Sequence, residues 1–240
     1  MFDVAFVDCK SSVSMDPYGV CFDLETRDKI NDMPGRFRDD KVKQLSISCL
    51  CALKFPADLA LSDPEEALKG AERLTYWAHK DGEIQSFLKL LDGAAVIGGF
   101  NLFGFDFPVL SKYYQRPRGG GTQRYRQHTY KTIDPFSRLR DATTVWFKLD
   151  TLLKANGLQP KTADGLQAIA WWEQGELELL RDYCMADVEL CTELMLKHQF
   201  NLPDGDAVPQ HIFSFQSMIL LLREDPGGER RKLARKESEE

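Results

Sequence analysis

Residues 20–26, Val-Cys-Phe-Asp-Leu-Glu-Thr, constrain the fold most, because they have the composition of a buried strand and yet include two acids. Side chains alternate between the faces of a strand, so Phe22 and Leu24 point into a core and Asp23 and Glu25 share the opposite face. Neighbouring carboxylates at the end of a buried strand repel each other and resist desolvation. A hard divalent cation, such as magnesium or manganese, would relieve both costs. The alternative is an ordinary strand end with two solvated acids.

The composition predicts one globular domain. The chain has 240 residues, of which 43% are hydrophobic and 28% charged, enough for a single buried core. We expect an N-terminal extension over residues 1–17, the domain over 18–222, and a charged, disordered tail over 223–240. Apolar runs such as residues 218–222 are too short to span a bilayer, and residues 1–3 lack the basic start of a signal peptide. An intracellular, cytoplasmic protein is therefore the expectation.

The cysteines lack the spacing of a metal or disulfide site. Cys49 and Cys51 are two residues apart on an expected strand, and Cys184 and Cys191 are seven apart on an expected helix. Neither pair has the C-x-x-C spacing typical of zinc sites. Buried reduced thiols, which behave as small hydrophobes, are therefore predicted.

The hydrophobic pattern predicts further elements along the chain. Strands are expected over residues 2–8, 43–53 and 94–100, and helices from residue 63 and over residues 82–91, 149–158, 166–173 and 176–198. Residues 27–42 are expected to be a polar connection, the Asp-Pro pair at 134–135 a turn, and residues 213–222 a closing helix or strand.

Two further acids stand near predicted helices. Asp106 begins a helix, with Pro108 in its first turn, and an aspartate there usually caps the helix or interacts with its dipole. Tyr183 and Asp187 lie four residues apart, one above the other, beside the apolar stripe of the last long helix. They could simply hydrogen-bond each other, although a charged group beside a buried stripe is unusual.

Residues 112–131 are basic within an acidic chain of formal net charge −6. They contain six Lys or Arg, four Tyr and no acid, and the glycines at 119–121 predict a mobile loop. Cations contact phosphates and aromatic rings stack on bases, so the segment predicts binding of a nucleic-acid strand, with Arg124 and Arg126 as substrate contacts. The alternative is a solvated loop that happens to be basic.

Together, the four acids and their neighbours resemble the three motifs of the DEDD superfamily of 3′–5′ exonucleases, which have the patterns D-x-E, N-x-x-x-F-D and Y-x-x-x-D. The chain supplies them in that order, with Asp23 and Glu25, then Asn101, Phe105 and Asp106, then Tyr183 and Asp187. The tyrosine is typical of the DEDDy branch. Residues 99–110 also resemble the proofreading domains of B-family DNA polymerases, and the chain resembles YprB-like exonucleases. Since no polymerase palm motif follows, a free-standing nuclease is expected.

The resemblance implies an α/β, ribonuclease-H-like fold, with a mixed sheet of about five strands flanked by helices. It also implies hydrolysis of single-stranded DNA or RNA from the 3′ end to 5′-mononucleotides, with two Mg²⁺ or Mn²⁺ ions. By analogy, the ions would be held by Asp23, Glu25, Asp106 and Asp187. Tyr183 would orient the attacking water. The substrate contacts implied by the motifs are Leu24, Thr26, Asn101 and Phe105.

Two other functions stay open at this level. One is a catalytically inactive nucleic-acid-binding or scaffold domain of the same fold, which would have no reason to retain all four acids and the tyrosine. The other is an endonuclease of the same fold, which would cut a circular single strand. The motifs are compatible with DNA and RNA alike, because recognition of the 2′-hydroxyl depends on the shape of the pocket.

Overall fold

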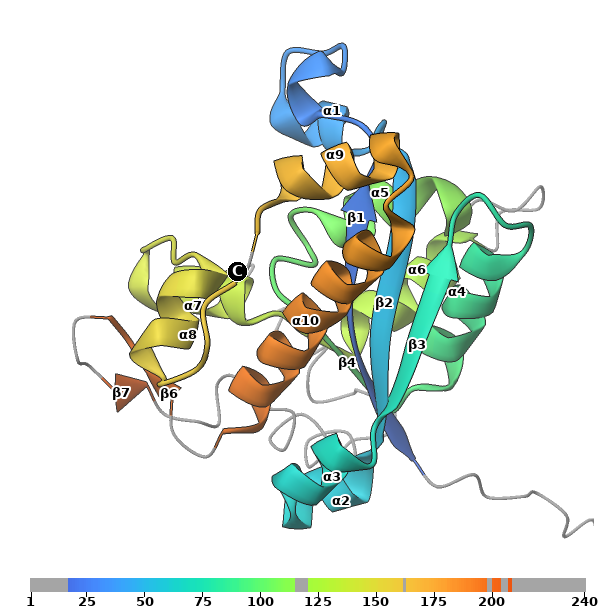
Figure 1. The fold of residues 1–240 in the computed structure, drawn as a ribbon. Helices are drawn as coiled ribbons and strands as arrows, with labels where there is room; N and C mark the ends of the chain where they lie inside the picture. Colours follow the sequence, from blue (N-terminus) through green and yellow to red (C-terminus); the bar gives the residue numbers. More distant parts are fainter. Residues whose placement is uncertain (1–16, 115–120, 162, 198–199, 204–206, 209–240) are drawn as a thin grey trace, which may run out of the picture.

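The computed structural model describes residues 17–114, 121–161, 163–197, 200–203 and 207–208. Its centre is a five-stranded sheet of order β3-β2-β1-β4-β5, with helices on both faces (Figure 1). The chain thus has the α/β, ribonuclease-H-like fold that the motifs implied. The strand expected over residues 2–8, the element expected over 213–222 and the tail lie outside the described residues.

The central strand is β1 (Tyr18–Thr26), which has a paired neighbour on each side. It pairs antiparallel with β2 (Ile47–Pro56), which pairs antiparallel with β3 (Glu72–Trp77). On its other side it pairs parallel with β4 (Val96–Gly98), which pairs parallel with β5 (Thr132–Ile133). Covered at its edges and on both faces, β1 is apolar through most of its length, which is why its acids stand out in the sequence.

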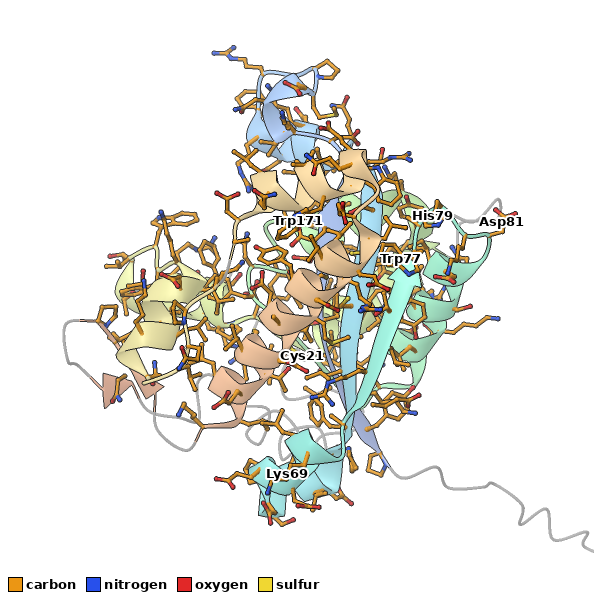
Figure 2. The ribbon with its side chains drawn as sticks, viewed as in Figure 1. Cys21, Lys69, Trp77, His79, Asp81 and Trp171 are labelled. Atoms are coloured by element: carbon orange, nitrogen blue, oxygen red, sulfur yellow. The ribbon has the colours of Figure 1, made fainter. Side chains whose placement is uncertain are left out.

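The pleat of β1 separates two buried cores. Phe22 faces the core that contains α4 (Glu83–Gly93), where its ring lies 5.0 Å from that of Phe87. Cys21 faces the other core, beneath α10 (Leu177–Leu196) (Figures 1 and 2). By alternation, the two acids of β1 share the face covered by α10. The sequence-based assignment of the two faces is confirmed.

The remaining elements complete the two helical layers and the ends of the sheet. They are η1 (Ile30–Asp32), α1 (Arg38–Val42), α2 (Ala57–Ser62), α3 (Pro64–Lys69), α5 (Asp106–Leu110), η2 (Ser111–Tyr114), α6 (Gly121–Tyr130), α7 (Pro135–Thr143), α8 (Leu149–Ala155), α9 (Gly165–Gln174) and the ribbon of β6 (Phe200–Asn201) with β7 (Ala207–Val208). All six predicted helices are present, including the one that begins at Asp106. Within the described residues, no helix has the length and apolarity needed to cross a membrane.

Two segments expected to be connections are instead helical. Residues 27–42 contain η1 and α1, so the strand predicted from residue 43 begins only at Ile47. The Asp-Pro pair expected as a turn starts α7, because the Asp134 carboxylate accepts the Phe136 N–H and Pro135 takes the first helical position, where a missing N–H has no cost.

Two further differences come from tertiary packing. β3 was not predicted, because as an edge strand it is only partly buried and has no clear apolar alternation. Residues 121–130, expected within a mobile loop, form α6, where Tyr125 packs edge-to-face against Phe107 at 5.8 Å between ring centroids. Residues 115–120 lie outside the described residues.

Candidate functional site

A cavity of about 610 Å³ lies at the carboxyl end of β1. Its walls come from segments that are distant in the sequence, namely β1, the turn before α5, the start of α8, α9 and α10. Nine of the predicted site residues line it: Asp23, Leu24, Glu25, Thr26, Asn101, Phe105, Asp106, Tyr183 and Asp187. The fold therefore brings all three motifs to one cavity.

Three carboxylates form the centre of this cavity. Asp23 and Glu25 come from alternate positions of β1, and Asp187 comes from α10, which crosses the same face of the sheet (Figure 1). Each offers an oxygen, and these oxygens all lie within 4.8 Å of one another. Glu25 and Asp187 are buried, and Asp23 is partly exposed. Hard oxygen donors crowded in this way are the ligand chemistry that suits a divalent cation.

The electrostatics of the cluster agree with its geometry. Burial, with the charge of Asp187 as a second cause, raises the pKa of Asp23 to about 7. Burial and the charge of Asp23 raise the pKa of Glu25 well above its ordinary value. Burial also raises the pKa of Asp187, although Lys161 opposes this effect. The ionised carboxylates are therefore costly to hold together without a cation, and the donor set fits one.

Asp106 lies beside this cluster rather than in it. It is 1% exposed, at the first position of α5, and its Oδ1 accepts the Leu24 N–H at 3.2 Å. This bond fixes the start of α5 to the end of β1. Burial, followed by the charge of Asp23, raises the pKa of Asp106 well above its ordinary value. The Asp106 carboxyl group is thus held next to Asp23, at the margin of the acidic cluster.

Tyr183 and Lys161 flank Asp187. The Lys161 ammonium lies 2.5 Å from Asp187 Oδ2 and 5.4 Å from the centre of the Tyr183 ring. Burial lowers the pKa of Lys161, but the charges of Asp187 and Asp23 outweigh it and raise the pKa, so the ammonium stays protonated. Burial and then the charge of Asp187 raise the pKa of Tyr183, so its hydroxyl stays neutral. The Tyr183 ring also packs against Trp171 of α9, labelled in Figure 2.

Lys161 is a residue of the site that the sequence did not indicate. Its ion-pair partner is on another element, and a single lysine between two helices carries no local signal of its role. The role of Lys161 becomes visible only in the folded structure, where it lines the cavity and contacts Asp187.

A second residue that the sequence did not indicate is Asp134. Its fully buried carboxylate accepts the N–H groups of Asn101 at 2.8 Å and Phe103 at 3.1 Å, besides capping α7. Asn101 needs this support because its backbone is left-handed, with φ of 62°. The turn is also tight enough that a Cβ at Gly104 would collide with the Asn101 side chain. The sequence feature that could have drawn attention to Asp134 is an aspartate followed by proline, which is typical of a helix start.

Three buried cysteines pack next to the acids. The sulfurs of Cys49, Cys51 and Cys184 lie within 4.8 Å of one another. However, the Cys51 thiol donates to the Arg181 carbonyl and the Cys184 thiol to the Asp23 carbonyl, each at 3.6 Å. These buried thiols fill the interface of β2 and α10, so the prediction of reduced buried cysteines is confirmed for the described residues.

The two arginines predicted to contact substrate do not line the cavity. Arg124 is 9% exposed, and its guanidinium donates to both carboxylate oxygens of Asp92, at 2.8 and 2.7 Å. His128, one turn later, lies 2.8 Å from the same carboxylate. Arg124 thereby attaches α6 to α4, and the substrate contacts expected of the two arginines stay predictions. Arg126 lies exposed on the same helix.

No family model and no curated protein matches the chain. Among solved structures, it is similar to a family B DNA polymerase from Pyrobaculum calidifontis, with 14% identity and a TM-score of 0.47, over 76% of this chain and 24% of the polymerase. It is also similar to E. coli exonuclease I in complex with a dT13 oligonucleotide, with 16% identity and a TM-score of 0.38, over 70% of this chain and 42% of the exonuclease. The chain thus spans less than half the length of either protein.

Proposed function

We propose that this protein is a metal-dependent 3′–5′ exonuclease that hydrolyses single-stranded DNA or RNA to 5′-mononucleotides. The observation that carries the proposal is the convergence of Asp23, Glu25 and Asp187, with oxygens within 4.8 Å of one another, in a cavity of about 610 Å³. Asp106 and Tyr183 line the same cavity. A cavity of this size can accept a terminal nucleotide.

Asp23, Glu25 and Asp187, together with Asp106 beside them, would hold two Mg²⁺ or Mn²⁺ ions. When bound, such ions lower the pKa of the attacking water and stabilise the charge that develops on the phosphate and on the leaving 3′-oxygen.

Tyr183 would position the attacking water rather than deprotonate it, because its raised pKa keeps the hydroxyl neutral. Lys161 would reduce the negative charge of the acidic cluster, which otherwise repels a phosphate. We assign to Leu24, Thr26, Asn101 and Phe105 contacts with the terminal nucleotide, since all four line the cavity around the acids.

The test uses 5′-labelled DNA and RNA oligonucleotides of matched sequence, with free or blocked 3′ ends, incubated with Mg²⁺ or Mn²⁺. A ladder that shortens from a free 3′ end, and that is lost in the Asp23→Asn variant, is expected. Cleavage of a circular single strand would instead indicate an endonuclease. Binding without cleavage in any divalent ion would favour the inactive binding domain.

A further inference from the structure

A chain of aromatic side chains leads from the cavity wall to the protein surface. Phe100 and Phe136 both line the cavity, and their rings meet edge-to-face at 5.4 Å between centroids. The Phe136 ring in turn lies 5.3 Å from that of Trp146, again edge-to-face. Trp146 is 66% exposed. The three rings therefore form one continuous contact from inside the cavity to solvent.

The indole of Trp146 is held in place although it is exposed. The Arg140 guanidinium lies 5.4 Å from the ring centroid, and Arg140 is itself paired with Asp141 at 3.0 Å. Phe136 also contacts the ring, edge-to-face. A side chain fixed before binding loses little conformational entropy when a ligand stacks on it.

A single exposed hydrophobic residue needs no functional explanation. Trp146 differs because its neighbours connect it to the cavity: Phe147, Lys148 and Leu149 line the cavity directly, and Lys148 is an exposed cation. An open indole beside two basic groups, Arg140 and Lys148, matches the needs of an unpaired strand, whose bases stack and whose phosphates are anionic. A base pair in a duplex keeps its faces covered by its neighbours, so a duplex would not use this surface.

We propose that Trp146 is a stacking subsite for an unpaired base of the substrate strand, upstream of the 3′-terminal nucleotide held in the cavity. This inference rests on the proposed function, since it takes the cavity as the place of the 3′ end. The path Phe100–Phe136–Trp146 then gives the direction in which the strand leaves the site.

The inference is tested by binding rather than by activity. Fluorescence anisotropy with labelled oligo-dT of about two to eight nucleotides, with Ca²⁺ in place of Mg²⁺, gives Kd as a function of length. For the longer strands, Trp146→Leu should weaken binding by about 5- to 100-fold, because stacking on an aromatic face is lost. Trp146→Phe should keep most of the affinity. Leu179→Ala is the matched control, since Leu179 is 49% exposed and does not line the cavity.

The length dependence decides the outcome. The ratio of the Kd of Trp146→Leu to that of the wild type should be near one for dinucleotides and rise once the strand reaches the indole. An unchanged Kd at every length, or equal affinity of the Leu and Phe variants, overturns the subsite. Circular dichroism of the variants excludes a loss of fold as the cause. Wild-type protein that neither binds nor cleaves any strand refutes the proposed function itself, which is a separate result.

Discussion

The pKa values of the acidic residues in the cavity depend on how the fold buries them, and not on their neighbours in the sequence. Asp23 and Glu25 follow each other on β1 by simple alternation, but their pKa values are raised mainly because α10 and its neighbours bury them. The same packing brings the carboxylate oxygens within 4.8 Å of one another, close enough to share a metal ion. Two predictions follow from these charges at the residue scale.

The first prediction concerns pH. In EDTA, the free energy of unfolding should fall as the pH rises from about 4 to about 7. The pKa of Asp23 is about 7 in the folded protein against an ordinary value of 3.8, so in this window the folded state binds the proton more tightly, and that stabilisation is lost as the pH rises. Urea denaturation across this range should give a flatter profile for Asp23→Asn. Parallel profiles would show that Asp23 titrates normally in the fold.

The second prediction concerns Lys161. Lys161→Met leaves the buried Asp187 without its cation, 2.5 Å away in the wild type, and should lower the free energy of unfolding in EDTA by about 3 kcal/mol. The matched control is Lys154→Met, which removes the exposed pair with Asp150 and should cost about 0.5 kcal/mol. Both are measured by urea denaturation at neutral pH.

In the double variant Lys161→Met with Asp187→Asn, most of the loss should be recovered, because no unpaired charge remains at that position. If the single variant is as stable as the Lys154→Met control, the ion pair does not contribute to the fold.

Among the helices and strands, the N-terminal ends of helices position residues of the site. Among the described residues, two helices begin with an Asp N-cap followed by proline, α3 after Asp63 and α7 after Asp134. Asp63 is exposed and caps only its own helix, through the Glu66 N–H. Asp134 is buried and also holds the turn of Asn101, which leads into α5 and Asp106.

The third prediction compares the loss of these two N-caps. Asp63→Ala should lower the free energy of unfolding by about 1 kcal/mol, the usual cost of a lost N-cap. Asp134→Ala should cost about 3 kcal/mol, because it also leaves the N–H groups of Asn101 and Phe103 without acceptors. Nuclease assays should show reduced cleavage only in Asp134→Ala. Equal losses of stability in the two variants would mean that the Asn101 turn does not depend on Asp134.

At the scale of the whole molecule, the cavity joins β1, α5 and α10, so a ligand bound there stabilises the entire domain. The fourth prediction is that Mn²⁺ at about one hundred times its Kd raises the free energy of unfolding by about 2.7 kcal/mol relative to EDTA. Asp187→Asn should reduce this gain at the same ion concentration, because one of its ligands is altered. Thermal melts with and without Mn²⁺ give both values, and an equal gain in both proteins would place the ion elsewhere.

Features that depend on neighbours along the chain could be predicted from the sequence. Alternation assigned Phe22 and Asp23 to opposite faces of β1, periodicity located the helices, and motif spacing selected the acids that line the cavity. The partner that each charge meets became visible in the folded molecule, which pairs Lys161 with Asp187 and Arg124 with Asp92. The reason is physical: a pattern along the chain sets which face a side chain occupies, whereas an ion pair depends on how separate elements pack.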